Sequence, residues 1–186
     1  CSNWQYTYWF AGFGNKINAV GKLVSGGILT KAVTNLGKNI LAVAENVEEM
    51  EGKFKVSFDN LSTEAERWAE TYSKAVGRGK YETMSFLADN QDLFSSLGAT
   101  TKQAMDMSIA IQKLGIDLAS FQNIQDADAI NRLTKGLMGE TQNLKVLGIY
   151  INQTALQREA IAKGYSKNLN ELDELTKFQL RYEIAL

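Results

Sequence analysis

The residues most able to do chemistry in this sequence are three groups of neighbouring carboxylates. They are Glu48, Glu49 and Glu51; Asp126 and Asp128; and Glu171, Asp173 and Glu174. Two converging carboxylates can act as acid and base in glycoside hydrolysis. On a helix, however, residues i and i+2 point in different directions, and Asp126 is placed to act as a helix N-cap. We therefore expect no catalytic residue and a protein that is not an enzyme.

The composition removes most other catalytic chemistry. The chain has 186 residues, with no histidine and one cysteine, Cys1. The usual general base and the Ser-His and Cys-His nucleophiles are therefore missing. The run from Gly136 to Glu140 is similar to a phosphate-binding loop, but it lacks the preceding strand, the Lys and the Ser/Thr. A tight helix-turn-helix is the better interpretation there, and we expect no metal and no cofactor.

The elements that position these residues are expected to be helices. The chain has no proline, the residue that helix interiors exclude most strongly. Strand-like alternation is confined to short, isolated runs, so the sequence predicts an all-α fold of about seven helices without a β-sheet. Capping boxes are expected at Thr63–Glu66 and Thr100–Gln103. The long helix after Thr100 is expected to bury one stripe, made of Ala104, Met107, Ile111, Leu114, Leu118 and Phe121.

An unbroken heptad pattern occupies residues 29–54. Its apolar positions alternate in spacing between four and three residues, which predicts a coiled-coil seam. The partner helix is either a second copy of the chain or a later helix of the same chain. The seam consists of Leu29, Val33, Leu36, Ile40, Val43, Val47, Met50 and Phe54.

The residues before this seam differ from the rest of the chain. Residues 1–44 hold four lysines and no acid, a charge of +4, so the remainder carries −5 to give the net −1. Residues 1–28 are aromatic and glycine-rich, which is typical either of an interaction arm or of a segment at a membrane interface. Three domains are expected: this N-terminal segment at 1–28, a long heptad helix at 29–58, and a multi-helix domain at 62–186, either compact or extended.

Short motifs follow one another in a fixed order from Val47 to the end of the chain. They are Glu64 to Trp68, Leu93 to Gly98, Asp117 to Phe121, Ile130 to Glu140, Leu144 to Ile149, Ala160 to Gly164, and Glu174 to Gln179 with Arg181 and Tyr182. This series resembles the helical domain of phage tail tape measure proteins of the minor-tail-protein type. One departure is Leu180, where the family pattern usually has a lysine.

The resemblance implies a structural virion protein. Family members are long helical chains in several copies, which set tail length during assembly inside the tail tube and take part in genome delivery at ejection. The implied partners are further copies of the chain, tail tube and tail tip proteins, tail assembly chaperones and the host membrane, without sequence-specific nucleic acid. The implied locations are the virion tail, the host cytoplasm during assembly and the host envelope at ejection.

The resemblance also marks a set of family-motif positions, to which we assign structural roles. They are Trp68, Gly98, Phe121, Gly139, Glu140, Gly148, Gly164, Thr176 and Arg181. Because the sequence starts without Met, we expect the chain to be a fragment of a longer protein. The alternative function is a membrane-active helical protein, a pore former or toxin that acts through residues 1–44.

Overall fold

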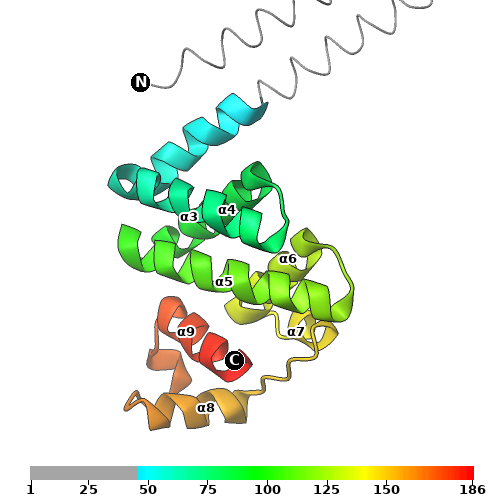
Figure 1. Cartoon of the computed structure of the whole chain (residues 1–186). Helices are drawn as coiled ribbons and strands as arrows, with labels where there is room; N and C mark the ends of the chain where they lie inside the picture. Colours follow the sequence, from blue (N-terminus) through cyan, green and yellow to red (C-terminus); the bar gives the residue numbers. More distant parts are fainter. Residues whose placement is uncertain (1–45) are drawn as a thin grey trace, which may run out of the picture. The chain divides into compact units, whose positions relative to one another are not determined.

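The computed structural model describes residues 46–186, and this part of the chain is helical without any strand. The predicted all-α fold is therefore confirmed. Residues Met50–Leu186 form one compact unit (Figure 1). The N-terminal segment 1–28 and the seam positions Leu29, Val33, Leu36, Ile40 and Val43 lie outside the described residues.

Glycines and small polar residues divide the described chain into helices. Gly77, in the left-handed conformation with a φ of 67°, ends the first complete α-helix, as its lack of a Cβ allows. Helical residues 46–58 come first, then η1 (Asp59–Leu61), α3 (Ser62–Val76), α4 (Lys80–Ser96), α5 (Thr101–Gln122), α6 (Asp126–Met138), α7 (Gln142–Val146), α8 (Gln153–Ala162), η2 (Leu169–Glu171) and α9 (Glu174–Ala185).

One predicted helix start is confirmed and two are wrong. The capping box at Thr100 and Gln103 is present at the start of α5. The capping box at Thr63 is not formed, because the 3₁₀ turn η1 runs directly into α3 and puts Leu61 at the N-cap. Asp126 is also not an N-cap: Gln125 holds that position, and the Asp126 carboxylate instead pairs with Arg78 from the loop before α4.

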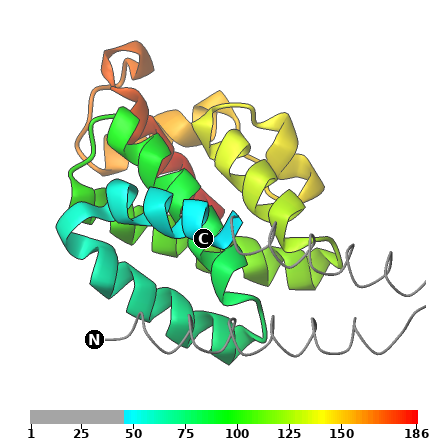
Figure 2. The ribbon, with the colours of Figure 1, turned by 90° about the horizontal axis from the view of Figure 1, so that it is seen from above.

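The main core forms around α5, which packs against both α4 and α6 (Figures 1 and 2). Phe94 of α4 and Phe178 of α9 meet edge to face, with ring centroids 4.8 Å apart, and both are almost fully buried. Such pairs add to the stabilisation that apolar burial provides. The last helix is therefore fixed to the centre of the unit by an aromatic anchor.

A second core cluster contains the end of the heptad seam. Phe54 is 1% exposed, its ring lies 4.5 Å from that of Phe58, and both pack with Ala65, Ala69 and residues of α4 and α5. Met50 is partly buried against the same cluster. The last seam position therefore packs within its own chain, which is one of the two alternatives left open by the sequence. The compact unit accordingly begins at Met50, earlier than the boundary at 58–62 placed from the sequence.

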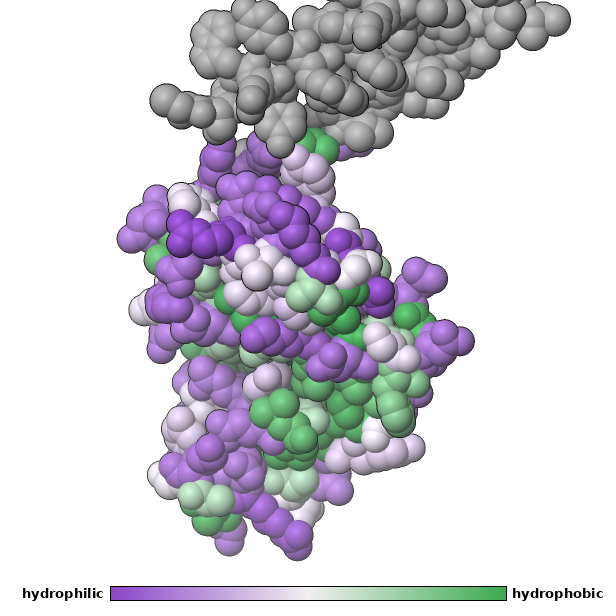
Figure 3. Space-filling model, in the orientation of Figure 1, coloured by the Kyte–Doolittle hydropathy of each residue, from purple (hydrophilic) through white to green (hydrophobic). Residues whose placement is uncertain are grey.

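The buried face of α5 differs from the predicted stripe. Phe121 is 84% exposed, and Met107, Leu114 and Leu118 are only partly buried. Ala104 and Ile111 of the predicted stripe are buried, and the rest of the buried face combines Met105 and Ile116 with small and polar residues, among them Gly115. Because α4 and α6 both approach α5 closely, small side chains are needed on the contacting faces. Met107, Leu114, Leu118 and Phe121 lie nearer the edge of the unit, where Figure 3 shows apolar residues gathered over α5, α7 and the end of α9.

Leu180, the one departure from the family pattern, lies in a third cluster. It is 2% exposed and packs with Leu156 and Ala160 of α8. A lysine ammonium at this depth would be costly to desolvate, so α8 and α9 require an apolar residue here. Leu180 therefore has a packing role in this chain.

The start of α9 gives a prediction with a pH dependence. The Asp173 carboxylate accepts hydrogen bonds from the backbone N–H and the hydroxyl of Thr176, at 2.8 and 2.9 Å, and these bonds lower its pKa below the ordinary value of 3.8. Asp173→Ala is expected to reduce the free energy of unfolding by about 1 kcal/mol at neutral pH. Because the folded-state pKa is lowered, this contribution is complete above pH 3.8 and is lost as the pH falls further.

Urea denaturation across this pH range checks the cap. Asp173→Asn is the control, because an amide oxygen still caps the helix but does not titrate. A stability difference between the wild type and Asp173→Ala that stayed constant down to the lowest pH measured would contradict this role.

Candidate binding groove beside the family-motif residues

The carboxylates of the pair Asp126 and Asp128 and of the group Glu171, Asp173 and Glu174 have separate partners. Asp126 pairs with Arg78, whereas Asp128 pairs with Arg132, one turn away on α6, at 2.8 Å. In the third group, Glu171 accepts hydrogen bonds from Ser166 and Asn168, Asp173 caps α9, and Glu174 binds Lys177. Each of these five carboxylates therefore forms a salt bridge or hydrogen bond that stabilises the fold locally.

Residues 46–186 offer neither a metal site nor a phosphate-binding loop. No group of three or more His, Cys, Asp or Glu side chains in this part of the chain could hold a metal ion. The run from Gly136 to Glu140 forms the tight connection between α6 and α7: Gly136 is buried, and a Cβ there would lie 2.3 Å from Leu144 Cγ. This glycine serves the close approach of two helices, in agreement with the helix-turn-helix interpretation.

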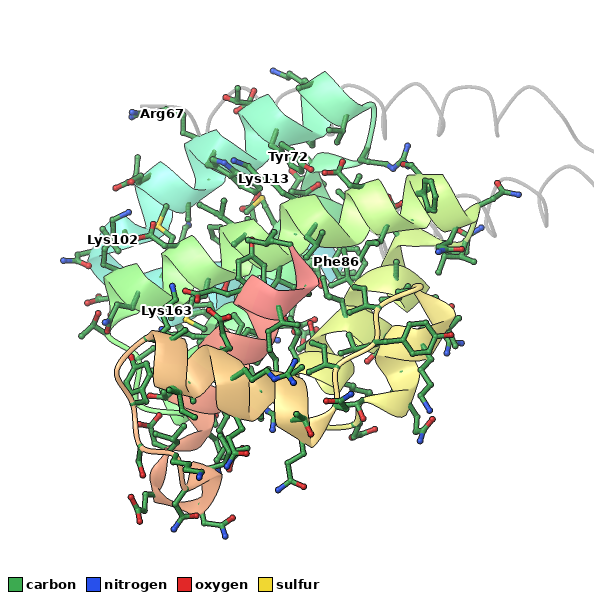
Figure 4. All side chains as sticks on the ribbon, turned by 90° about the horizontal axis from the view of Figure 1, so that it is seen from below. Arg67, Tyr72, Phe86, Lys102, Lys113 and Lys163 are labelled. Carbon is green, nitrogen blue, oxygen red and sulfur yellow. The ribbon has the colours of Figure 1, made fainter. Side chains whose placement is uncertain are left out.

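Of the cations labelled in Figure 4, Lys102 and Lys113 lie on α5, Arg67 lies on α3 and Lys163 follows α8. Lys102 of α5 binds Asp106 at 2.7 Å, and Lys163, just after α8, binds Glu183 at 2.6 Å. Lys113 lies 6.0 Å from the ring of Trp68, which itself stacks on Tyr72. The contacts of Lys163 and Lys113 join neighbouring elements, whereas the Lys102–Asp106 pair lies within α5.

Four of the family-motif positions are glycines at helix ends. Gly98, Gly139, Gly148 and Gly164 all have positive φ, from 79° to 125°, in the region that favours glycine. They follow α4, α6, α7 and α8 in turn. The glycine spacing of the motif series therefore sets where helices end.

Two of the motif positions meet in space. Arg181 Nη1 of α9 donates a hydrogen bond of 2.8 Å to the carbonyl oxygen of Leu137 in the last turn of α6, and the guanidinium lies over Gly139, where a Cβ would come within 3.5 Å of Nη2. A cation at a helix C-terminus is favoured by the helix dipole. Burial lowers the pKa of Arg181 from its ordinary value.

The other motif positions have local roles. Thr176 donates to the cap of α9, and Glu140 accepts a hydrogen bond from Asn143 at 3.1 Å. Trp68 is half-buried on α3, whereas Phe121 is exposed at the end of α5. The structure therefore brings Gly139 and Arg181 together and leaves Trp68 and Phe121 on other elements.

An open groove with a volume of about 350 Å³ lies beside Arg181. Four separate parts of the chain form it: the start of α7, the start of α8, η2 and α9. Its walls combine apolar side chains with amides and charges. The lining residues are Thr141, Ile151, Asn152, Gln153, Leu156, Leu169, Asn170, Glu174, Lys177 and Arg181.

The groove has an excess of positive charge. Lys177 and Glu174 neutralise each other at 2.8 Å, whereas Arg181 makes no salt bridge among the described residues. The first turn of α8 holds no acidic residue, so the partial positive charge of its N-terminus also remains. Asn152 caps this helix by accepting a hydrogen bond from the backbone N–H of Ala155 at 2.8 Å.

Sequence reasoning found only parts of this groove. Glu174, Lys177 and Arg181 belong to the last motif of the series. Gln153 and Asn170 gave no signal, because they join the groove only through the packing of α8 and η2 against α9. Apolar periodicity indicates which face of a single helix is buried, but it does not indicate which residues of different helices come together in a groove.

Removing the Arg181 side chain gives a second prediction. Arg181→Ala is expected to lower the free energy of unfolding by about 1–2 kcal/mol, because the Leu137 carbonyl loses a charged donor and the stem of the side chain leaves its packing. Arg158→Ala, at an exposed position of α8, is the matched control and should change stability by less than about 0.5 kcal/mol. Equal effects in chemical denaturation would contradict the role assigned to Arg181.

Comparison with known proteins gives no assignment: no family model, no curated protein and no solved structure matches this chain. None of the helices in residues 46–186 is long and apolar enough to cross a membrane. The fold and the groove therefore define an all-α unit with a candidate binding site.

Proposed function

We propose that this chain is a structural segment of a phage tail tape measure protein. The observation that carries the proposal is the position of the motif series in the fold. Gly98, Gly139, Gly148 and Gly164 end four helices, and Arg181 joins α9 to the end of α6. Motifs that coincide with the joints of one compact helical unit support a shared architecture, as opposed to a chance sequence of weak matches.

The proposal divides the work between two parts of the chain. A helix rises about 1.5 Å per residue, so a continuous heptad helix converts chain length into physical length. Residues 29–54 carry that pattern. The short helices of the compact unit are unsuited to measuring length, and we assign this unit to contacts with tail proteins during assembly or after ejection. The proposed locations are the tail tube, the host cytoplasm during assembly and the host envelope at ejection.

Mass spectrometry of purified particles tests the proposal. In the phage or prophage that encodes this chain, peptides from residues 50–186 are expected in mature particles in several copies per tail. Recovery of these peptides from cell membranes, with none in purified particles, would contradict it. Particles from a strain with an early stop codon in this reading frame are the control for carry-over.

The proposed partners begin with the chain itself, together with tail tube and tip proteins and assembly chaperones. The heptad seam predicts that residues 1–186 form an oligomer in solution, detectable by light scattering. Ile40→Asp is expected to reduce the mass to that of a monomer, because a carboxylate in the seam would be buried without a partner. A monomeric wild-type chain would contradict self-association.

The membrane-active alternative depends on residues 1–44, which lie outside the described residues. Leakage from liposomes distinguishes it. A peptide of residues 1–60 that releases dye, with no release by residues 61–186, would favour a membrane role for the N-terminal segment and would be compatible with the tail protein.

A further inference from the structure

Beyond this function, and independently of it, the groove beside Arg181 has the features of a binding site. The guanidinium of Arg181 has five N–H donors, and one of them, on Nη1, donates to the Leu137 carbonyl oxygen. The guanidinium is partly buried, and Glu174 interacts with it electrostatically but accepts no hydrogen bond from it. The remaining donors are therefore ready to bind an acceptor that enters the groove.

A second positive feature faces the same space. Asn152 and Gln153 at the start of α8 both line the groove, and the first turn of this helix holds no acid that would neutralise the dipole. Helix N-termini stabilise anions. Glu174 also lines the groove and interacts with Lys177, at 2.8 Å, and with Arg181, so these three side chains together carry one excess positive charge. The net preference of the groove is consequently for a negative group.

The walls of the groove define what carries that group. Ile151, Leu156 and Leu169 provide apolar surface, and the amides of Gln153 and Asn170 can both donate and accept hydrogen bonds, as peptide groups require. From this combination we infer that the groove binds an acidic peptide segment of a partner protein, with a Glu or Asp carboxylate on Arg181 and an adjacent apolar side chain between α8 and η2.

The probe for this site is an acetylated, amidated tripeptide of sequence Leu-Glu-Leu, titrated into the 1–186 chain and followed by NMR. We expect saturable shifts at the amide of Gln153 and at the guanidinium of Arg181. The neutral peptide Leu-Gln-Leu is expected to bind at least about fivefold more weakly, because it lacks the charge that Arg181 recognises.

Gln153→Glu is the decisive variant. An acid in the first turn of α8 suits the helix dipole, so the fold is retained, but the new carboxylate repels the ligand. Binding of Leu-Glu-Leu is expected to fall by about tenfold or more. Gln103→Glu is the matched control: it makes the same change in the first turn of α5, within the capping box and outside the groove, and should leave affinity unchanged.

Three results would overturn the inference. They are equal affinity of the two peptides, unchanged binding by Gln153→Glu, and saturable shifts that map outside the groove. Inorganic phosphate is titrated in parallel. If phosphate binds in the groove more tightly than Leu-Glu-Leu, the site belongs to a free anion and the peptide assignment is wrong.

Discussion

Phe54→Ala should lower the free energy of unfolding of this protein by about 3–5 kcal/mol. The side chain is 1% exposed and contacts the ring of Phe58, so its removal leaves a cavity between the helix of residues 46–58 and the helices α3 and α4. Val56, two residues away on the same helix, is 83% exposed. Val56→Ala should change stability by less than about 0.5 kcal/mol, which makes it the matched control.

Urea denaturation of residues 1–186, followed by circular dichroism, measures both values. The comparison also decides how the last heptad position is used. If Phe54 packs within its own chain, the cost of Phe54→Ala is independent of protein concentration. A cost that appeared only at concentrations where the chain is oligomeric would place Phe54 in an intermolecular seam and contradict the core described above.

Gly115→Ala is expected to destabilise the unit by about 1–3 kcal/mol, although alanine is the better helix former. The reason is the close approach of α5 and α6. A Cβ at Gly115 would lie 2.5 Å from Ile130 Cγ1 and 3.3 Å from Ile130 Cα. A β-branched side chain has few other rotamers, and the backbone cannot give way locally, so the two helices must separate.

Gly52→Ala is the control for this prediction and should have the opposite sign. Gly52 lies in the helical stretch 46–58, and a Cβ there would meet nothing within 4 Å. Alanine is then expected to stabilise by about 0.5–1 kcal/mol through helix propensity. Thermal and urea denaturation of both variants supply the test. Stabilisation by Gly115→Ala would mean that α5 and α6 are not in close contact.

Much of the fold could be predicted from the sequence because local signals decide helix ends. Thr100, Asn152 and Gly77 each mark a boundary through a bond or a conformation that the neighbouring residues alone determine. Where a helix start depended on tertiary structure, prediction failed. Asp126 has the chemistry of an N-cap, but Arg78, which is 48 residues away in sequence, takes its carboxylate.

The choice of buried face on α5 could not be predicted for a similar reason. Apolar periodicity favoured a stripe that includes Phe121, yet the close approach of neighbouring helices selected small residues such as Gly115 and Ala119. Only the packing distances reveal that requirement. The groove was equally inaccessible, since residues such as Gln153 and Asn170 join it only through the packing of α8 and η2 against α9.

The most direct test of the central claim, that this chain belongs to a tape measure protein, is tail length. Phage would be built with one or two further copies of residues 27–54 inserted in frame after Phe54, which keeps the heptad spacing unbroken. Because a helix rises about 1.5 Å per residue, we expect tails that are longer by about 42 and 84 Å, respectively, in electron micrographs. Tails of unchanged length in both strains, with the lengthened protein present in the particles, would contradict it.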